Sequence, residues 1–245
     1  TCTGYLCPGL TSYVAELLGL RPDTLLLDLV GQGCGAALPN MRTGEALLLS
    51  GRAQVVLSVC VEVCTAALYL DNDPGVLISA CLFGDGAGAA VLTPAPGRAR
   101  SIHWETSASV LKPGERDLLR FEQKNGMLRN VLDLQVPKLA ATHASALADR
   151  VLEAAGVTRS EIQAWILHPG GRDVLVALQR ELGFPADALR WSSAVLNEYG
   201  NISSASVYFV LKQALAGRAP AGWWWLSSFG AGFSCHGALL KAGAP

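Results

Sequence analysis

Residues 24–38 read TLLLDLVGQGCGAAL, and this stretch decides the fold class. An apolar run, LLLDLV at 25–30, ends at a glycine and is followed by a segment with the composition of a helix. The run AQVVLSVCVEV at 53–63 is also apolar almost throughout and does not alternate with polar residues. Continuous apolar runs are typical of strands buried on both faces of a sheet. The sequence therefore predicts an α/β protein with buried mixed sheets in a layered core.

The rest of the chain continues this alternation of helices and strands. Helices are expected near residues 9–20, 35–50, 131–155, 172–183 and 203–216. Strands are expected near 24–30, 54–62, 101–108, 164–167, 223–228 and 233–240, with a glycine turn entering a further strand within 82–93 and a polar loop near 111–126. The segment TPAPGRAR at 93–100, rich in proline and glycine, is the best internal boundary.

Composition excludes several classes of protein. Of the 245 residues, 51% are hydrophobic and 16% are charged, and the net charge is -1. Such a chain folds around a large core and offers no basic surface to nucleic acid. The apolar runs are shorter than the roughly 20 residues that span a membrane, so no membrane insertion is expected. Seven cysteines, an odd number without a CxxC pair, predict free thiols in a reducing, cytoplasmic setting and no metal site.

Cys34 is the first candidate for chemistry. It follows a buried strand and opens a helix in GQGCGAAL, so the first-turn amides and the helix dipole are expected to favour its thiolate. The flanking glycines allow a substrate to approach closely. The alternative is a cysteine buried in the core, and the cysteines at 60, 64, 81 and 235 are interpreted in that way.

Two more polar residues stand where α/β folds present functional groups. His168, in AWILHPGG, lies at the carboxyl end of a buried strand, and Asn201, in NEYGNISSAS, precedes a helix. The histidine can also cap a turn, and an asparagine before a helix is most often its N-cap. In the order Cys, His, Asn, the three supply a nucleophile, a base and a neutral donor for an oxyanion, as thioester chemistry requires.

Five motifs of the chain resemble those of type III polyketide synthases, the chalcone and stilbene synthase family. They are GQGCGAALP, LFGDGAGAA, HPGG, EYGNISSAS and SSFGAGFS. The resemblance runs from Thr1 to the last strand and implies the thiolase fold, in which two pseudo-symmetric α/β halves make up a subunit that assembles as a homodimer. It implies an incomplete first half at 1–98, which carries the nucleophilic cysteine, and a second half at 99–245, which carries the histidine and the asparagine. The family's amino-terminal segment, which carries the basic residues for coenzyme A, has no counterpart here, so we expect the chain to be a fragment.

The resemblance also implies a role for each site residue. Cys34 is expected to carry the acyl group, His168 to act as general base and donor, and Asn201 to complete the oxyanion site. Phe83 is expected at the gate between the coenzyme A tunnel and the cavity. The other positions implied to lie around the substrate are Cys2, Thr3, Cys64, Ala67, Ser203, Gly170 and Gly230.

Two further positions follow from the same resemblance. The second gatekeeping phenylalanine of the family belongs within 121–130, where Phe121, Arg129 and Asn130 give no clear match. Cys7 matches the position from which family members contribute a side chain to the partner subunit's cavity wall.

The implied reaction is an acyl transfer that needs no metal or redox cofactor. The Cys34 thiolate, kept ionised by the helix terminus and an imidazolium at His168, attacks a starter acyl-CoA. Malonyl-CoA then loses its carboxylate, and the resulting enolate condenses with the acyl thioester. Repetition gives a chain that cyclises to a pyrone or a phenolic ring. Because small groups occupy the cavity positions, we expect an elongated fatty acyl starter.

Three alternatives are open. A condensing enzyme like β-ketoacyl-ACP synthase III uses Cys, His and Asn on the same fold, but it has a glutamine and an asparagine after the histidine, where this chain has HPGG. A papain-like hydrolase shares the order of residues but carries a tryptophan motif after the cysteine and secretory disulfides. A chain of this kind can also serve only as a binding partner.

Overall fold

A computed structural model gives the structure, which describes residues 7–67, 70, 72–95, 100–124, 127–185 and 187–244. The α-helices are α1 (Leu10–Leu18), α2 (Ala37–Leu49), α3 (Pro74–Leu82), α4 (Val136–Ala154), α5 (Arg172–Leu182), α6 (Arg190–Tyr199) and α7 (Ser206–Ala216). The strands are β1 (Val56–Glu62), β2 (Gly86–Leu92), β3 (Ile102–Leu111), β4 (Leu119–Lys124), β5 (Met127–Leu132), β6 (Ile162–Leu167), β7 (Gly222–Gly230) and β8 (Ser234–Ala242). Short 3-10 helices are η1 (Gly33–Gly35), η2 (Cys64–Ala67), η3 (Pro113–Leu118), η4 (Arg159–Glu161) and η5 (Ser203–Ala205).

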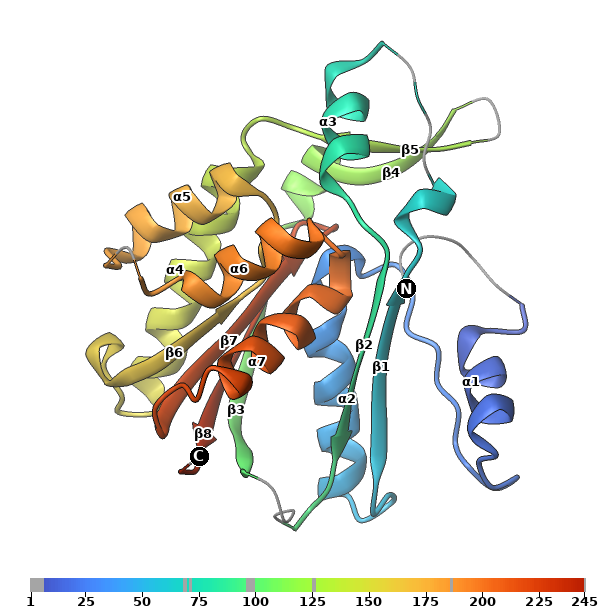
Figure 1. Cartoon of the computed structure of the whole chain (residues 1–245), viewed down its shortest axis with the longest axis vertical. Coiled ribbons are helices and arrows are strands. Elements are labelled where there is room, and N and C mark those ends of the chain that lie inside the picture. Colours follow the sequence, from blue (N-terminus) through green and yellow to red (C-terminus); the bar gives the residue numbers. More distant parts are fainter. Residues whose placement is uncertain are drawn as a thin grey trace.

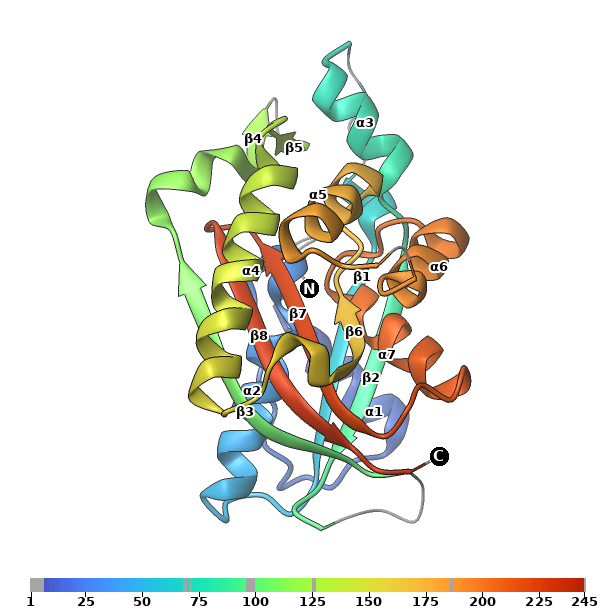
Figure 2. The ribbon, with the colours of Figure 1, turned by 90° about the vertical axis from the view of Figure 1, so that its left-hand side faces the viewer.

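The central element is a mixed sheet in the order β3-β8-β7-β6, where only β6 and β7 run parallel. Helices α4 and α5 cover one face and α2 and α7 the other, where β1 and β2 form a second, antiparallel layer (Figures 1 and 2). Successive residues of β7 serve both faces, since Trp224 packs with α2 and α7 and Trp225 with α4. Both rings are at most 1% exposed, so the prediction of buried mixed sheets in a layered core is confirmed.

Two segments differ from the predicted elements. Residues 24–30 form no strand, although they were expected to, and Leu25 is 66% exposed, because no strand of the described part hydrogen-bonds to them. The prediction of a polar loop at 111–126 is also wrong for this segment. It contains η3 and β4, and β4 and β5 form an antiparallel hairpin, so that the long helix begins only at Val136. Pairing between the two strands stabilises the hairpin, and this pairing cannot be deduced from the pattern of apolar residues in either segment alone.

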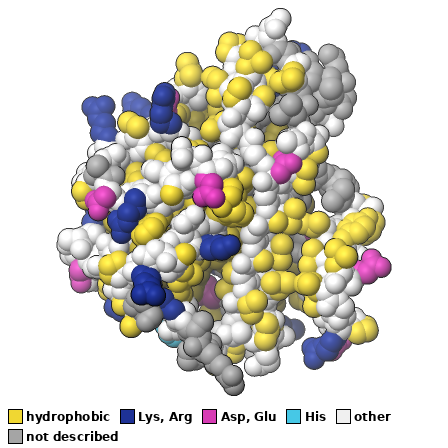
Figure 3. Space-filling view, viewed as in Figure 1, with side chains coloured by type: hydrophobic (Ala, Val, Ile, Leu, Met, Phe, Trp, Pro, Cys, Tyr) yellow, Lys and Arg dark blue, Asp and Glu magenta, His cyan; other side chains and the backbone are white. Residues whose placement is uncertain are grey.

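Apolar side chains are also exposed on one side of the molecule. Figure 3 shows them over α1, β1 and β2, where Leu17 is 86% and Val91 64% exposed. In the described ranges, none of the helices combines the length and apolarity needed to cross a membrane. The division of the chain between 98 and 99 stays a prediction, because residues 96–99 lie outside the described part.

Candidate active site

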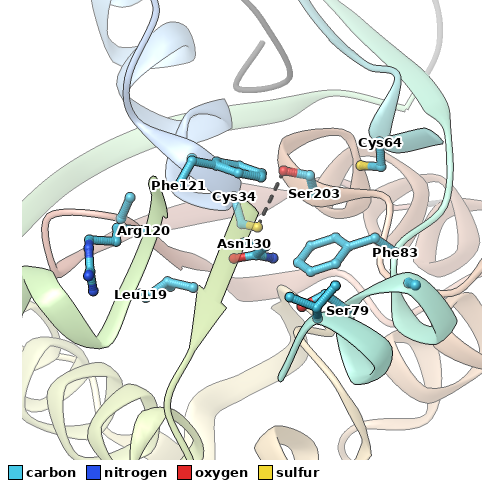
Figure 4. Close-up of a pocket in the computed structure, with 13 residues that line it drawn as sticks. Cys34, Cys64, Ser79, Phe83, Leu119, Arg120, Phe121, Asn130 and Ser203 are labelled. Carbon is cyan, nitrogen blue, oxygen red and sulfur yellow. Dashed lines mark hydrogen bonds between the residues drawn. The ribbon is translucent and has the colours of Figure 1, made fainter. Parts of the chain in front are cut away.

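A cavity lies where η1, η2, η5, α3 and the β4–β5 hairpin meet (Figure 4). Its wall is mostly apolar. The residues that line it are Gly33, Cys34, Cys64, Val76, Ser79, Ala80, Phe83, Leu119, Arg120, Phe121, Asn130, Ser203 and Ala231. Cys34 therefore presents its thiol to a mostly apolar cavity.

A hydrogen bond from Ser203 holds the Cys34 thiol in place. The hydroxyl of Ser203 donates to its Sγ over 3.3 Å, and Ser203 has a left-handed backbone with φ of 49° that turns the chain into η5. Burial raises the pKa of Cys34 to about 12, the Ser203 hydrogen bond lowers it and the charge of Glu62 raises it. Burial therefore opposes the resting thiolate that was expected at this position. Cys34 lies in η1, whereas α2 begins at Ala37, so the thiol is not in the helix's first turn.

The end of β7 fixes the loop that carries Cys34. A Cβ atom on Gly230 would stand 2.5 Å from the backbone N of Gly35 and 2.6 Å from the carbonyl of Gln32, so only glycine fits this approach. The hydroxyl of Ser228 donates to the carbonyl of Gly35 over 3.0 Å. Gly230 itself does not line the cavity, and its place in the structure is to position η1.

His168 directly follows β6 and is 1% exposed. Among the described residues, neither of its ring nitrogens has a hydrogen-bond partner, and its ring meets Phe229 edge-on with 5.1 Å between centroids. Burial lowers the pKa of the imidazole to about 3, so the ring is neutral. Burial therefore opposes the imidazolium that was expected at this position. A buried neutral imidazole has one N–H that can donate a hydrogen bond and one nitrogen that can accept one.

Asn201 ties together the segments around the site. Its Nδ2 donates to the carbonyl of Gly170 over 3.1 Å, and its Oδ1 accepts from the backbone N of Ser203 over 2.9 Å. Its backbone also pairs with Leu82 and Gly84, on either side of Phe83. The bond to Ser203 resembles a cap at the start of η5, so the capping interpretation describes part of what the amide does. One N–H of the side chain is left over for another acceptor.

Some of the predicted substrate positions line the cavity, others lie outside it, and others are not in the described part of the chain. Cys64, Phe83 and Ser203 line the cavity with Cys34, whereas Gly170 packs against Phe229, where an added Cβ would lie 2.7 Å from Cζ. The described part excludes Cys2 and Thr3 and the side chain of Ala67.

The hairpin supplies the aromatic wall that the sequence left unassigned. Phe121 on β4 stands directly opposite Asn130 on β5, and both line the cavity. Arg129 forms ion pairs with Asp73 and Glu122 instead and does not line it. The hairpin register therefore places an aromatic ring and an amide at the cavity wall. This pairing was missed from the sequence because a loop was expected at 111–126.

Glu62 is a buried charge that sequence reasoning missed. It ends β1, is 1% exposed and accepts a hydrogen bond from the hydroxyl of Ser204. Its one signal in the sequence is that it is the only charged residue of the run at 53–63. In the described part, no group of three or more His, Cys, Asp and Glu residues is arranged to hold a metal ion.

Comparisons with known proteins agree with this geometry. The profile described as "Chalcone and stilbene synthases, C-terminal domain" matches residues 109–242, and that of "FAE1/Type III polyketide synthase-like protein" matches residues 5–112. The chain belongs to the type III polyketide synthase family.

Two curated relatives and two solved structures extend this result. The chain is 33% identical to "3,5-dihydroxyphenylacetyl-CoA synthase" from Streptomyces toyocaensis over 98% of its length and 64% of the relative's. It is 31% identical to "1,3,6,8-tetrahydroxynaphthalene synthase" from Streptomyces peucetius subsp. caesius, over 98% of this chain and 65% of that protein. It thus spans less than two thirds of either relative.

The solved structures confirm the thiolase-like fold of this family member. PKS-I from the brown alga Ectocarpus siliculosus gives a TM-score of 0.89 at 28% identity, over 98% of this chain and 66% of that one. The 1,3,6,8-tetrahydroxynaphthalene synthase from Streptomyces coelicolor A3(2) gives 0.89 at 28% identity, over 100% and 70%.

Proposed function

We propose that the protein is an acyltransferase of the type III polyketide synthase kind, which condenses malonyl-CoA iteratively onto an acyl-CoA starter. The observation that carries the proposal is the Cys34 thiol in the wall of an apolar cavity, hydrogen-bonded by Ser203 and backed by family membership. A thioester needs such a nucleophile and a cavity without competing water.

Loading of the starter begins from a neutral thiol. As Sγ of Cys34 attacks the starter's carbonyl carbon, its proton passes to the neutral imidazole of His168, and the bond to the CoA sulfur breaks. The imidazolium then returns the proton to the departing CoA thiolate, so the net change is the exchange of one thioester for another. The depressed pKa of His168 makes its imidazolium a strong acid for that last step.

Extension requires stabilisation of an enolate. Malonyl-CoA loses CO₂, and the enolate oxygen accepts hydrogen bonds from His168 and from the second N–H of Asn201, whose first N–H is held by Gly170. The enolate carbon then attacks the acyl group on Cys34, and the carbon–sulfur bond breaks to release the Cys34 thiolate, which takes up a proton from water. Losing one such donor in a dry site typically reduces the rate by about two to three powers of ten.

The proposal also covers the starter group, the class of product, the oligomeric state and the compartment. The apolar wall formed by Val76, Leu119 and Phe121 suits an elongated fatty acyl group. Two relatives are named for polyhydroxylated aromatic products, which supports a phenolic ring over a pyrone. We further propose a cytoplasmic homodimer that uses coenzyme A thioesters and no metal or redox cofactor.

The test is an incubation with radiolabelled malonyl-CoA and a panel of starters, with the Cys34→Ala variant as control. We expect labelled pyrones or phenols that depend on Cys34, and faster turnover of medium and long acyl-CoA than of bulky aromatic starters. The starter assignment fails if the aromatic starters react faster. Product formed only from malonyl carried on acyl carrier protein would favour the β-ketoacyl-ACP synthase alternative, which none of the comparisons supports.

A further inference from the structure

Asn130 places an unused amide in the cavity. The other uncharged polar side chains of the wall have partners, since Ser203 donates to Cys34 and Ser79 to the carbonyl of Gly75. Among the described residues, no hydrogen-bond partner reaches the carboxamide of Asn130, which Figure 4 draws among the lining side chains. An amide in an apolar wall is costly to cover unless the bound molecule supplies its partner.

The hairpin holds this amide in one place. Asn130 is paired across the strands with Phe121. Its neighbour Arg129 forms an ion pair with Glu122 within the hairpin and joins the hairpin to Asp73. Asp73 in turn caps α3, accepting from the backbone N of Gly75 over 2.9 Å. The amide is therefore presented by an anchored strand, which is what a specific hydrogen bond requires.

The charges around Asn130 decide what kind of group it takes. Both arginines of the hairpin are already neutralised, Arg129 as described and Arg120 by Asp117 and Glu122. Figure 4 shows the guanidinium of Arg120 turned away from Cys34. A carboxylate at this wall would lose its hydration without gaining a free cation, whereas a ketone oxygen needs only a neutral donor.

We infer that Asn130 is a specificity-determining residue that donates a hydrogen bond to a keto oxygen of a β-ketoacyl chain carried by Cys34. The inference rests on the proposed function and adds to it the chemical class that the cavity prefers once extension has begun. A saturated chain of the same length covers the amide and leaves it unpaired, so the site disfavours it. The amide thereby favours retention of a chain that has already been extended.

The experiment compares two thioesters of equal length, octanoyl-CoA and 3-oxooctanoyl-CoA, as acyl donors to Cys34. Intact-mass spectrometry follows the rate of acylation in the wild type, in Asn130→Leu and in the matched control Gln123→Leu. Gln123 is an exposed amide on the same hairpin that does not line the cavity. We expect the wild type and the control to prefer the 3-oxo chain by about tenfold, as one hydrogen bond to a desolvated amide predicts. The ratio should fall toward one in Asn130→Leu.

Two outcomes overturn the inference. If Asn130→Leu still prefers 3-oxooctanoyl-CoA, a group other than Asn130 binds the keto oxygen. If the wild type has no preference between the two thioesters, no group of the cavity binds the keto oxygen. If neither thioester acylates Cys34 in the wild type, the proposed function itself fails, and the inference fails with it. Circular dichroism and the unfolding midpoint verify that both variants are folded.

Discussion

Acidification should destabilise the protein through His168, and the variant His168→Gln should remove this effect. The folded state keeps the imidazole neutral, since its pKa is about 3, whereas the unfolded chain protonates it near pH 6.5. A pKa depressed on folding means that the stability is present above pH 6.5 and is lost as the pH falls toward 3. Between pH 6.5 and 5 the loss is about 2 kcal/mol, because each pH unit costs about 1.4 kcal/mol.

Urea unfolding at pH 7 and pH 5, followed by the fluorescence of the six tryptophans, measures the difference. The fall in the free energy of unfolding should be about 2 kcal/mol smaller in His168→Gln than in the wild type. Burial also lowers the pKa of His236, to about 4, but this histidine is present in both proteins and cancels. His103 is exposed, so His103→Gln is the matched control and should behave as the wild type. An effect of opposite sign refutes the reasoning, because it means that an imidazolium paired with a Cys34 thiolate stabilises the folded site.

Two further substitutions probe the supports of the site. Gly230→Ala should destabilise the protein by about 1 to 3 kcal/mol and slow acylation of Cys34, because the new methyl group displaces η1, whereas Gly114→Ala meets no atom within 4 Å and should do neither. Differential scanning calorimetry measures the loss of stability, and intact-mass spectrometry measures the rate of acylation of Cys34. If Gly230→Ala and Gly114→Ala have the same stability and the same acylation rate, the packing argument is contradicted. Ser192→Ala should cost about 1 to 3 kcal/mol, because its buried hydroxyl donates to the carbonyl of Leu167 over 2.7 Å at the end of β6. Urea titration measures it, and a cost near zero means that water replaces the hydroxyl.

The sequence predicted those parts of the fold in which local pattern and burial agree. Strand β6, followed by His168 and a Pro-Gly-Gly turn, lies where the apolar run ended, and Gly19 ends α1 in the left-handed conformation expected of a terminal glycine. The pairing of strands with one another could not be predicted from the sequence. Nothing local in residues 119–132 specifies that Phe121 stands opposite Asn130, and an apolar run at 25–30 predicts a strand whether or not a neighbour is there to pair with it.

The same distinction holds for the site. Glycine and strand-end positions identified Cys34, His168 and Asn201, and resemblance gave them roles. Protonation could not be predicted in this way, because it depends on burial from all sides. The pKa of Cys34 is raised chiefly by desolvation, which outweighs any pull of the helix that begins three residues later. Glu62 was missed because its partner, Ser204, is distant in sequence.

The central claim is that Cys34 is the residue that takes up the acyl group. Incubation with a fatty acyl-CoA, followed by intact-mass and peptide mass spectrometry, tests it most directly. The account predicts a single added acyl group on the peptide that contains Cys34, absent in Cys34→Ala and retained in the matched variant Cys81→Ala, whose cysteine is exposed outside the cavity. An acyl group on Cys64, the other thiol of the cavity, or no acyl group at all, contradicts it.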